Sequence, residues 1–177
     1  MRIFLAPVNI SKHLLEIIFN NLSNYLVEDI IPINLTFELE SLFSPERNQY
    51  YSTGFLKQAI DKTKDFDGKV IILTSLDIFI PVLTFVFGEA QLNGKHSVVS
   101  ICRLYEEFYA NEGREDLLIE RASKEILHEL GHNLGLIHCI DWDCVMHSSN
   151  SVEEIDIKGE FFCNSCKELI SKFNVVK

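Results

Sequence analysis

The sequence predicts a single α/β domain in which a mixed β-sheet is covered by helices, and three observations lead to this fold class. The chain has 177 residues, close to the usual size of one domain. Hydrophobic residues make up 47% and charged residues 24%, which is enough apolar side chain for a substantial core. In the first half, the patterns follow the order strand, helix, strand, helix, strand, which predicts parallel strand pairs with helices packed on the sheet.

The first three elements are predicted from hydrophobic spacing. Residues 2–8 are apolar and rich in β-formers, so we expect a strand inside the sheet. Residues 13–26 place apolar side chains at helical spacing, and Ser11 can cap the start of that helix. Residues 33–40 alternate apolar and polar side chains, which is typical of a half-buried strand.

The middle of the chain continues the alternation. Residues 44–54 are turn-like, residues 55–64 are helical, and residues 67–79 predict a turn followed by a buried strand. The longest apolar stretch, residues 76–87, contains a charge and a proline and is well short of the ~20 residues of a bilayer span. We interpret it as buried sheet.

The second half has a different organisation. Two β-like runs flank Asn93 and Gly94, which is a strong hairpin signal. A long helix is predicted from about Glu112, and a last helix near residues 167–173. Between these helices the chain is short, contains cysteines and is interrupted by Ser, Asn and Gly, so we expect irregular structure there.

Composition excludes some classes of partner. There are 26 acidic and 16 basic residues, a formal charge of −10, whereas a nucleic-acid partner would require a basic face. The apolar run at the start is ended early by polar residues, so we see no secretory signal and expect a cytoplasmic protein. We expect a monomer that binds a peptide or short protein substrate, with no nucleic-acid or membrane partner.

The motif that carries the chemistry is HELGHNLGLIHC, residues 128–139. Positions four apart share one face of a helix, so His128 and His132 can present two imidazole nitrogens to one metal ion. Glu129 is rotated about 100° from His128, which places it beside the metal, where a base can take a proton from water. The alternative is a set of ordinary surface histidines. Three of the six histidines within eleven residues argue against it.

The third histidine requires the chain to turn. His138 is about 240° further round than His132, so a straight helix would place it outside the site. Gly135 lies between them and can adopt the left-handed conformation that ends a helix. Three neutral imidazoles with one open position are typical of catalytic zinc, whereas a structural site has four enclosing ligands. The spacing therefore predicts a catalytic zinc on His128, His132 and His138.

Four cysteines predict a second zinc site. A C-x4-C pair and a C-x2-C pair, separated by eighteen residues, match the spacing of a tetrahedral structural site: Cys139, Cys144, Cys163 and Cys166. Free thiols or a redox-active pair are the alternatives. We favour zinc because the C-terminal segment is too short and polar to fold on apolar burial alone. The sequence therefore predicts two Zn²⁺ ions per chain.

Two other sulfur-containing residues have simpler interpretations. Met146 follows the cysteine loop and is either core filler or an apolar floor beneath the histidines. Cys102 lies in a β-like run and is interpreted as an inert buried thiol. We expect residues 1–138 to form a sheet and helix subdomain that includes the active-site helix, and residues 139–177 to form a small C-terminal subdomain.

These motifs resemble a known family. HELGHNLGLIHC matches the metzincin pattern H-E-x-x-H-x-x-G-x-x-H. Cys139 directly after the third histidine, the C-x4-C spacing, Val145-Met146 and FCNSC extend the match to residue 166. The chain resembles the archaemetzincins, small metzincins with a second, four-cysteine zinc.

The resemblance implies a metzincin-like twisted mixed sheet with backing helices, an active-site helix, and a small zinc-bound C-terminal subdomain. It also implies that Glu129 is the general base and that Met146 supplies a Met-turn. Several metzincin branches place a tyrosine shortly after that methionine, whereas His147, Ser148 and Ser149 follow here. The residue that stabilises the transition state is therefore left unassigned.

The function predicted from these sites is a zinc-dependent metallopeptidase that hydrolyses peptide bonds with zinc-activated water and a glutamate general base. We expect the peptide to lie extended along an edge strand at residues 85–92, which is otherwise an ordinary hairpin strand. Aminopeptidase, endopeptidase and short-peptide hydrolase activity all stay open. The alternative is a zinc-binding regulatory or interaction protein with little turnover. Glu129 favours the enzyme, because zinc binding does not require it.

Overall fold

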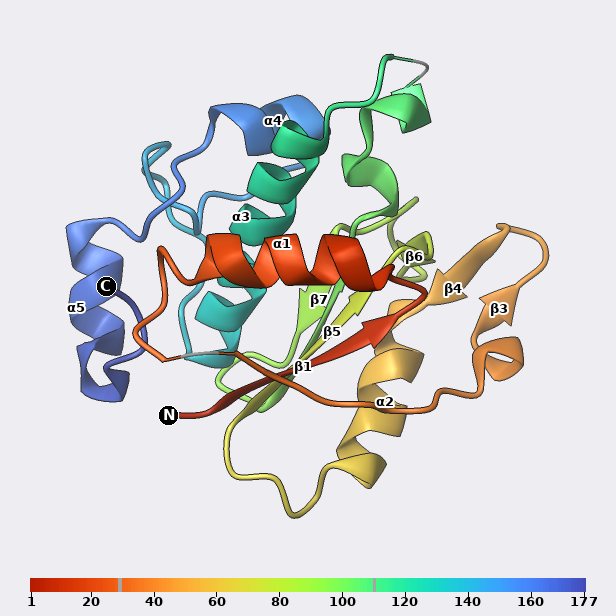
Figure 1. The fold of residues 1–177 in the computed structure, drawn as a ribbon, viewed down its shortest axis with the longest axis horizontal. Coiled ribbons are helices and arrows are strands. Elements are labelled where there is room, and N and C mark those ends of the chain that lie inside the picture. Colours follow the sequence, from red (N-terminus) through yellow and green to blue (C-terminus); the bar gives the residue numbers. More distant parts are fainter. Residues whose placement is uncertain (29, 110) are drawn as a thin grey trace.

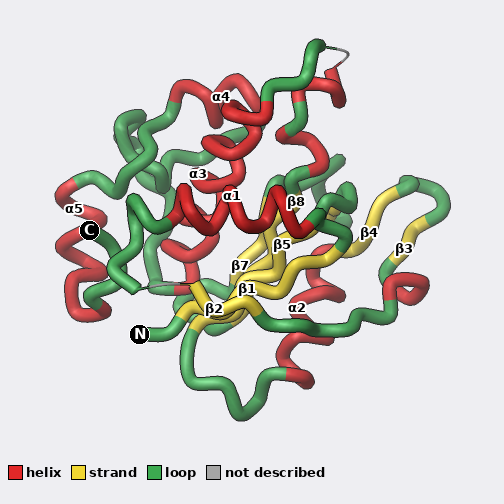
Figure 2. Tube along the Cα trace, viewed as in Figure 1, coloured by secondary structure: helices red, strands yellow, loops and turns green. Residues whose placement is uncertain are grey.

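The computed structural model describes residues 1–28, 30–109 and 111–177 and contains two β-sheets (Figures 1 and 2). The main sheet has the order β2-β1-β5-β8-β7, with bounds Ile30–Pro32, Ile3–Val8, Lys69–Thr74, His96–Ser100 and Gly88–Ala90. Neighbouring strands of this sheet run parallel, except that β7 runs antiparallel to β8. A small second sheet has the order β3-β4-β6, with bounds Phe43–Ser44, Gln49–Tyr51 and Ile78–Phe79. The predicted mixed α/β class is confirmed.

Five α-helices surround these sheets in the described part of the chain: α1 (Lys12–Leu22), α2 (Ser52–Lys62), α3 (Glu115–Asn133), α4 (Val152–Ile157) and α5 (Asn164–Ile170). Short 3₁₀ turns are found at Leu39–Ser41, Cys102–Leu104, Glu106–Tyr109 and Ser171–Phe173. The predicted cap of α1 is confirmed, because the Ser11 hydroxyl accepts a hydrogen bond from the Leu14 N–H at 3.2 Å. None of the described helices combines the length and the apolar character that crossing a membrane requires.

The core lies on both faces of the main sheet, because successive strand residues point in opposite directions. In β5, Ile71 and Leu73 belong to the larger cluster beneath α1 and α3, while Ile72 belongs to the smaller cluster beneath α2. Figure 1 shows α1 crossing α3, against which it packs. The larger cluster also includes residues after position 139, such as Met146 and Phe162. The division into residues 1–138 and 139–177 stays a prediction.

The strand predicted at residues 33–40 is wrong. Strand β2 lies just before these residues and ends at Pro32. The next residue, Ile33, still donates its N–H to the Leu5 carbonyl of β1 at 2.9 Å. Residues 33–40 do alternate between half-buried and exposed, as their pattern indicates, and Phe37 packs on Phe55 of α2. An alternating pattern indicates which way the side chains face, but a strand also requires a partner strand. Residues 33–40 have none in the described structure, so they lie outside the sheets.

Three further expectations are corrected. The turn-like residues 44–54 contain most of the β3–β4 hairpin. The apolar run 76–87 contributes only β6 to a sheet, and Val82 is 84% exposed.

Helix α4 lies where irregular structure was predicted. It has six residues, too few for a helical pattern, and its carbonyls at Ile155 and Asp156 accept hydrogen bonds from Lys124 of α3. These elements depend on contacts between distant segments.

The predicted hairpin is confirmed, and it fixes an edge strand beside α3. Asn93 has a φ of 52°, as a tight turn requires. Its N–H donates to the His132 carbonyl at 2.8 Å. The Asn133 side chain donates to the carbonyls of Gln91 and His96, at 3.1 and 3.0 Å. Strand β7, at the edge of the sheet, is thereby held against the helix that carries the histidine motif.

Candidate metal centres

Helix α3 ends where the spacing of the histidines requires a turn. Gly135 has a φ of +98°, in the left-handed region that favours glycine. The N–H of Leu136 donates back to the Gly131 carbonyl at 2.9 Å, so the chain reverses and returns His138 towards α3. The predicted arrangement of helix, glycine turn and returning histidine is confirmed.

The three histidines converge. Their ligand nitrogens all lie within 4.8 Å of one another, and the Nε2 atoms of His128 and His132 are 3.1 Å apart. A tetrahedral zinc with bonds of ~2.1 Å would hold two such nitrogens about 3.4 Å apart. The donor set and its spacing therefore fit a zinc ion with one coordination position open.

Backbone carbonyls orient two of these rings. The Nδ1 atoms of His128 and His132 lie 2.8 Å from the carbonyls of Val145 and Leu136, respectively. A carbonyl only accepts, so each Nδ1 carries the proton, and each Nε2 keeps its lone pair for a metal. Burial lowers the pKa of His128, His132 and His138, which favours the neutral form that ligates.

Glu129 lies beside the histidines in a buried position. Its side chain packs against Gly88 of β7, where a Cβ would approach the Glu129 Oε1 to 2.5 Å. Burial raises the pKa of the Glu129 carboxyl well above its ordinary value, the Glu125 carboxylate adds to this, and the Lys158 ammonium opposes it. A buried carboxyl with a raised pKa, in a cleft beside a metal site, has the character of a catalytic acid or base.

Met146 lies beneath the histidines, as one of the two sequence interpretations proposed. It is fully buried, and a Cβ on Gly131 would overlap its Sδ. Gly131 is on α3 between His128 and His132, so Met146 packs directly under the helical turn that presents two ligands. Its contribution is packing.

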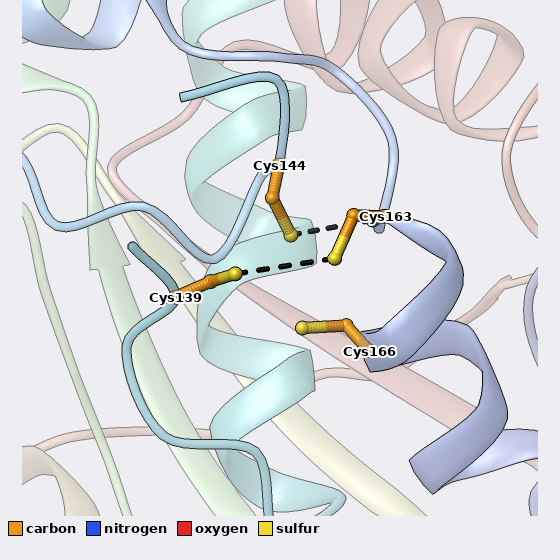
Figure 3. A group of neighbouring side chains, drawn as sticks. All are labelled: Cys139, Cys144, Cys163 and Cys166. Carbon is orange, nitrogen blue, oxygen red and sulfur yellow. Dashed lines mark hydrogen bonds between the residues drawn. The ribbon is translucent and has the colours of Figure 1, made fainter. Parts of the chain in front are cut away.

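The four cysteines also come together, and Figure 3 shows their sulfurs pointing toward one another between two segments of the chain. Their sulfurs lie within 4.8 Å of one another, and the Cys139 and Cys163 Sγ atoms are 3.9 Å apart. A tetrahedral site with Zn–S bonds of ~2.3 Å would give about 3.8 Å. A hydrogen bond from the Cys166 N–H lowers the pKa of Cys163, whereas burial raises the pKa of Cys144 and Cys166. The cluster fits an enclosed zinc site. Cys102 lies outside it, half-buried.

A cleft of about 670 Å³ opens beside the histidines. Strand β7, the segment before it, and Ser148 and Ser149 also line this cleft. Sequence reasoning missed three residues here: Gly88, Glu125 and Lys158. Glu125 precedes His128 by three positions on the same helical face, which is a detectable signal. Gly88 and Lys158 are distant in sequence, and no local pattern marks them.

This combination of a mixed α/β fold, three histidines at a cleft and a buried glutamate beside them defines a zinc metallopeptidase. The chain belongs to peptidase family M54, whose family model matches residues 13–172.

Two archaemetzincins are similar enough to this chain to support the family match. The archaemetzincin of Pyrococcus horikoshii is 44% identical over 131 residues, which are 73% of this chain and 70% of that protein. The archaemetzincin of Saccharolobus solfataricus is 38% identical over 179 residues, covering 98% of this chain and 95% of that one. The predicted resemblance to the archaemetzincins is confirmed.

Solved structures share the fold. The archaemetzincin of Archaeoglobus fulgidus superposes with a TM-score of 0.78 at 32% identity, over 96% of this chain and 100% of that chain. A zinc-dependent peptidase of Methanocorpusculum labreanum superposes with a TM-score of 0.79 at 28% identity, over 95% of this chain and 99% of that chain.

Proposed function

We propose that this metallopeptidase hydrolyses peptide bonds at a zinc ion held by His128, His132 and His138, with Glu129 as the general base. The observation that carries the proposal is the position of Glu129. It is buried on α3 beside two of the ligands and lines the same cleft as all three. Zinc ligation alone would not require a carboxylate there.

The side chains around the zinc have separate roles. When bound, zinc is the Lewis acid that lowers the pKa of water and polarises the scissile carbonyl. Glu129 accepts the proton of the attacking water and passes it to the leaving amine, a role typically worth 10²- to 10⁴-fold in rate. Gly88 lets the carboxylate lie close against β7. The carbonyls of Val145 and Leu136 hold the ligand rings in their metal-binding tautomer.

The peptide would bind along β7. This strand pairs on one side with β8, and residues 83–90 line the cleft. An extended substrate can add to such a sheet edge through main-chain hydrogen bonds. Action on a short peptide from its amino terminus and cleavage within a longer one both fit this geometry. Acetylating the amino terminus of a cleaved peptide separates them, because an aminopeptidase would no longer accept it.

We propose a second, structural zinc on Cys139, Cys144, Cys163 and Cys166, and thus two ions per chain. Thiolate ligands suit a reducing compartment such as the cytoplasm. We also propose that the protein is a monomer. Elemental analysis and sedimentation of the purified protein measure both quantities. One zinc with four titratable thiols would exclude the second site.

The test of catalysis compares two variants. Glu129→Gln keeps the side-chain volume and removes the proton acceptor, so we expect at least ~10²-fold slower hydrolysis with zinc content and thermal stability unchanged. His128→Ala leaves two ligands, so metal and activity should be lost together. Peptide cleavage and zinc content are measured in the same samples. Hydrolysis at the wild-type rate by a zinc-loaded Glu129→Gln protein would exclude the mechanism. A wild type that holds both zincs but cleaves no peptide of a diverse library would favour a binding protein.

A further inference from the structure

Two exposed apolar residues line the cleft beside the proposed zinc ligands. Leu92, which follows β7, is 59% exposed, and Ile137, in the turn after α3, is 71% exposed. Both line the cleft together with His132 and His138. Large apolar side chains often occur singly on a protein surface without any role. These two are distinguished by their shared position in the cleft.

Contacts between the β7–β8 hairpin and the turn after α3 bring the two residues to the same end of the cleft. The N–H of Asn93, the residue after Leu92, donates to the His132 carbonyl at 2.8 Å. A Cβ on Gly135 would lie 3.5 Å from the Asn93 Oδ1, and Ile137 follows Gly135 by two positions. The hairpin and the turn are therefore adjacent, and each contributes one exposed apolar residue. We call this pair, Leu92 and Ile137, the apolar end of the cleft.

The charged side chains of the cleft are paired or directed elsewhere. In the described part of the chain they are Glu89, Glu125, Glu129 and Lys158. Lys158 pairs with Glu125 at 2.7 Å, and Glu125 precedes His132 by seven positions, about 10 Å along α3. The Glu89 carboxylate accepts a hydrogen bond at 2.8 Å from the Thr53 hydroxyl of α2, which packs on the other face of the main sheet. The remaining carboxylate is the proposed base.

We propose that the apolar end is a substrate subsite, in which Leu92 and Ile137 select an apolar side chain of the peptide on one side of the scissile bond. The inference rests on the function proposed above, because it concerns the substrate of that site. An apolar side chain placed against both residues would remove apolar surface of all three from water. A charged side chain would lose water there and gain no partner of opposite charge.

The other direction along the cleft has a different character. Leu83 is 51% exposed and also lines the cleft, but it lies before Gly88 along the chain, whereas Leu92 lies after it. The paired Glu125 and Lys158 lie towards the start of α3. A peptide that extends both ways from the zinc would therefore meet the apolar end in one direction only, and a test has to examine the two directions separately.

The experiment uses the zinc-loaded protein and two series of peptides that carry a hydroxamate group, which chelates zinc. In one series the hydroxamate ends the peptide, and in the other it precedes the peptide, so the side chains extend from the zinc in opposite directions. Leu, Ser, Glu or Lys occupies the first or the second position from the chelating group. Calorimetry measures binding, so no turnover is needed. We expect one of the series to bind a Leu compound at least about tenfold more tightly than its Ser, Glu and Lys counterparts.

The decisive variant is the double substitution Leu92→Ser with Ile137→Ser. Both side chains are exposed, so the fold and the zinc content should be retained. We expect the Leu preference of that one series to fall by about tenfold, while the other series binds as before. Ile140→Ser is the matched control, because Ile140 is 95% exposed and three positions from Ile137 but is not among the described residues that line the cleft. It should bind both series as the wild type does.

A second variant serves if the double variant loses its zinc. Leu92→Lys places an ammonium group at the apolar end, so the Glu compound should replace the Leu compound as the preferred ligand of the same series. Equal binding of all compounds by the wild type would overturn the proposal. It would also be overturned by a Leu preference that persists in the zinc-loaded double variant or in Leu92→Lys.

Other outcomes assign the two residues differently. Self-association of the wild type that the double variant abolishes, with no change in hydroxamate preference, would place them in an interface between two copies of the chain. Failure of both series to bind the zinc-loaded protein would contradict the proposed metal site and the subsite with it. Selective binding without peptide cleavage would contradict only the proposed catalysis, whereas cleavage without selective binding would contradict only the subsite.

Discussion

The two candidate metal centres gather their ligands within the same 4.8 Å, yet they are built in opposite ways. The histidines come from eleven consecutive residues, a helix and the turn after it, and they line a cleft. The cysteines come from two segments with eighteen residues between them, and Cys144 and Cys166 are buried in the main core. In this chain the local histidine set borders the cleft, whereas the cysteine set brings two segments of the chain together.

The two centres also share a short segment. Cys144 belongs to the cysteine cluster, the carbonyl of the next residue, Val145, orients His128, and Met146 packs beneath Gly131 of α3. Cys139, another cysteine of the cluster, directly follows His138. The enclosed centre therefore determines the position of groups that support the open one. We expect damage to pass from the cysteine centre to the histidine centre more readily than in the opposite direction.

The largest effect should come from Cys166→Ser. Zinc binding at an enclosed site is coupled to folding, and its apparent binding free energy is roughly 10–16 kcal/mol in zinc-finger peptides. We expect loss of the enclosed zinc, rapid proteolysis after residue 139, and weakened metal binding and hydrolysis at the histidines. Zinc analysis and limited proteolysis measure these effects. Cys102→Ser is the matched control and should behave as wild type. A Cys166→Ser protein with two zincs and wild-type protease resistance would contradict the structural role.

A smaller and reversible effect is expected from mild chelation. The proposed open site would expose a coordination position to a chelator, whereas four thiolates would enclose the proposed second ion. The first equivalent of zinc removed should abolish hydrolysis while the circular dichroism and melting temperature stay nearly unchanged. Adding one equivalent back should restore activity. If unfolding accompanied removal of that first equivalent, the assignment of the two roles would be reversed.

Much of both candidate sites could be predicted from the sequence, because the histidines and the cysteines each have a fixed spacing. The helical offset of His128 and His132, the turn at Gly135 and the two cysteine pairs each follow from local geometry, and the structure brings each set together. The hairpin at Asn93 was also predicted, since its turn chemistry is local.

Features that depend on contacts between distant segments could not be predicted in this way. The unpaired residues 33–40 have a strand pattern without a partner, and the short helix α4 is held by Lys124 rather than by its own periodicity. Lys158 meets Glu125 across 33 positions. Gly88 is even further from Glu129 in the sequence, and its small size is explained only once β7 and α3 are packed together.

Gly88→Ala should produce the smallest effect and tests the open centre alone. A Cβ there would lie 2.5 Å from Oε1, 2.6 Å from Cγ and 2.7 Å from Cδ of Glu129, so the carboxylate must move. Misplacing a catalytic group by about 1 Å can cost as much as 10²-fold in rate, and we expect a loss of about ten- to a hundredfold. Both zincs and the melting temperature should be retained, because no ligand moves. Gly113→Ala is the matched control. A Cβ at that position also overlaps a glutamate, Glu107, but one that does not line the cleft among the described residues. Full activity in Gly88→Ala would show that Glu129 has room to relocate, and that β7 does not position the base.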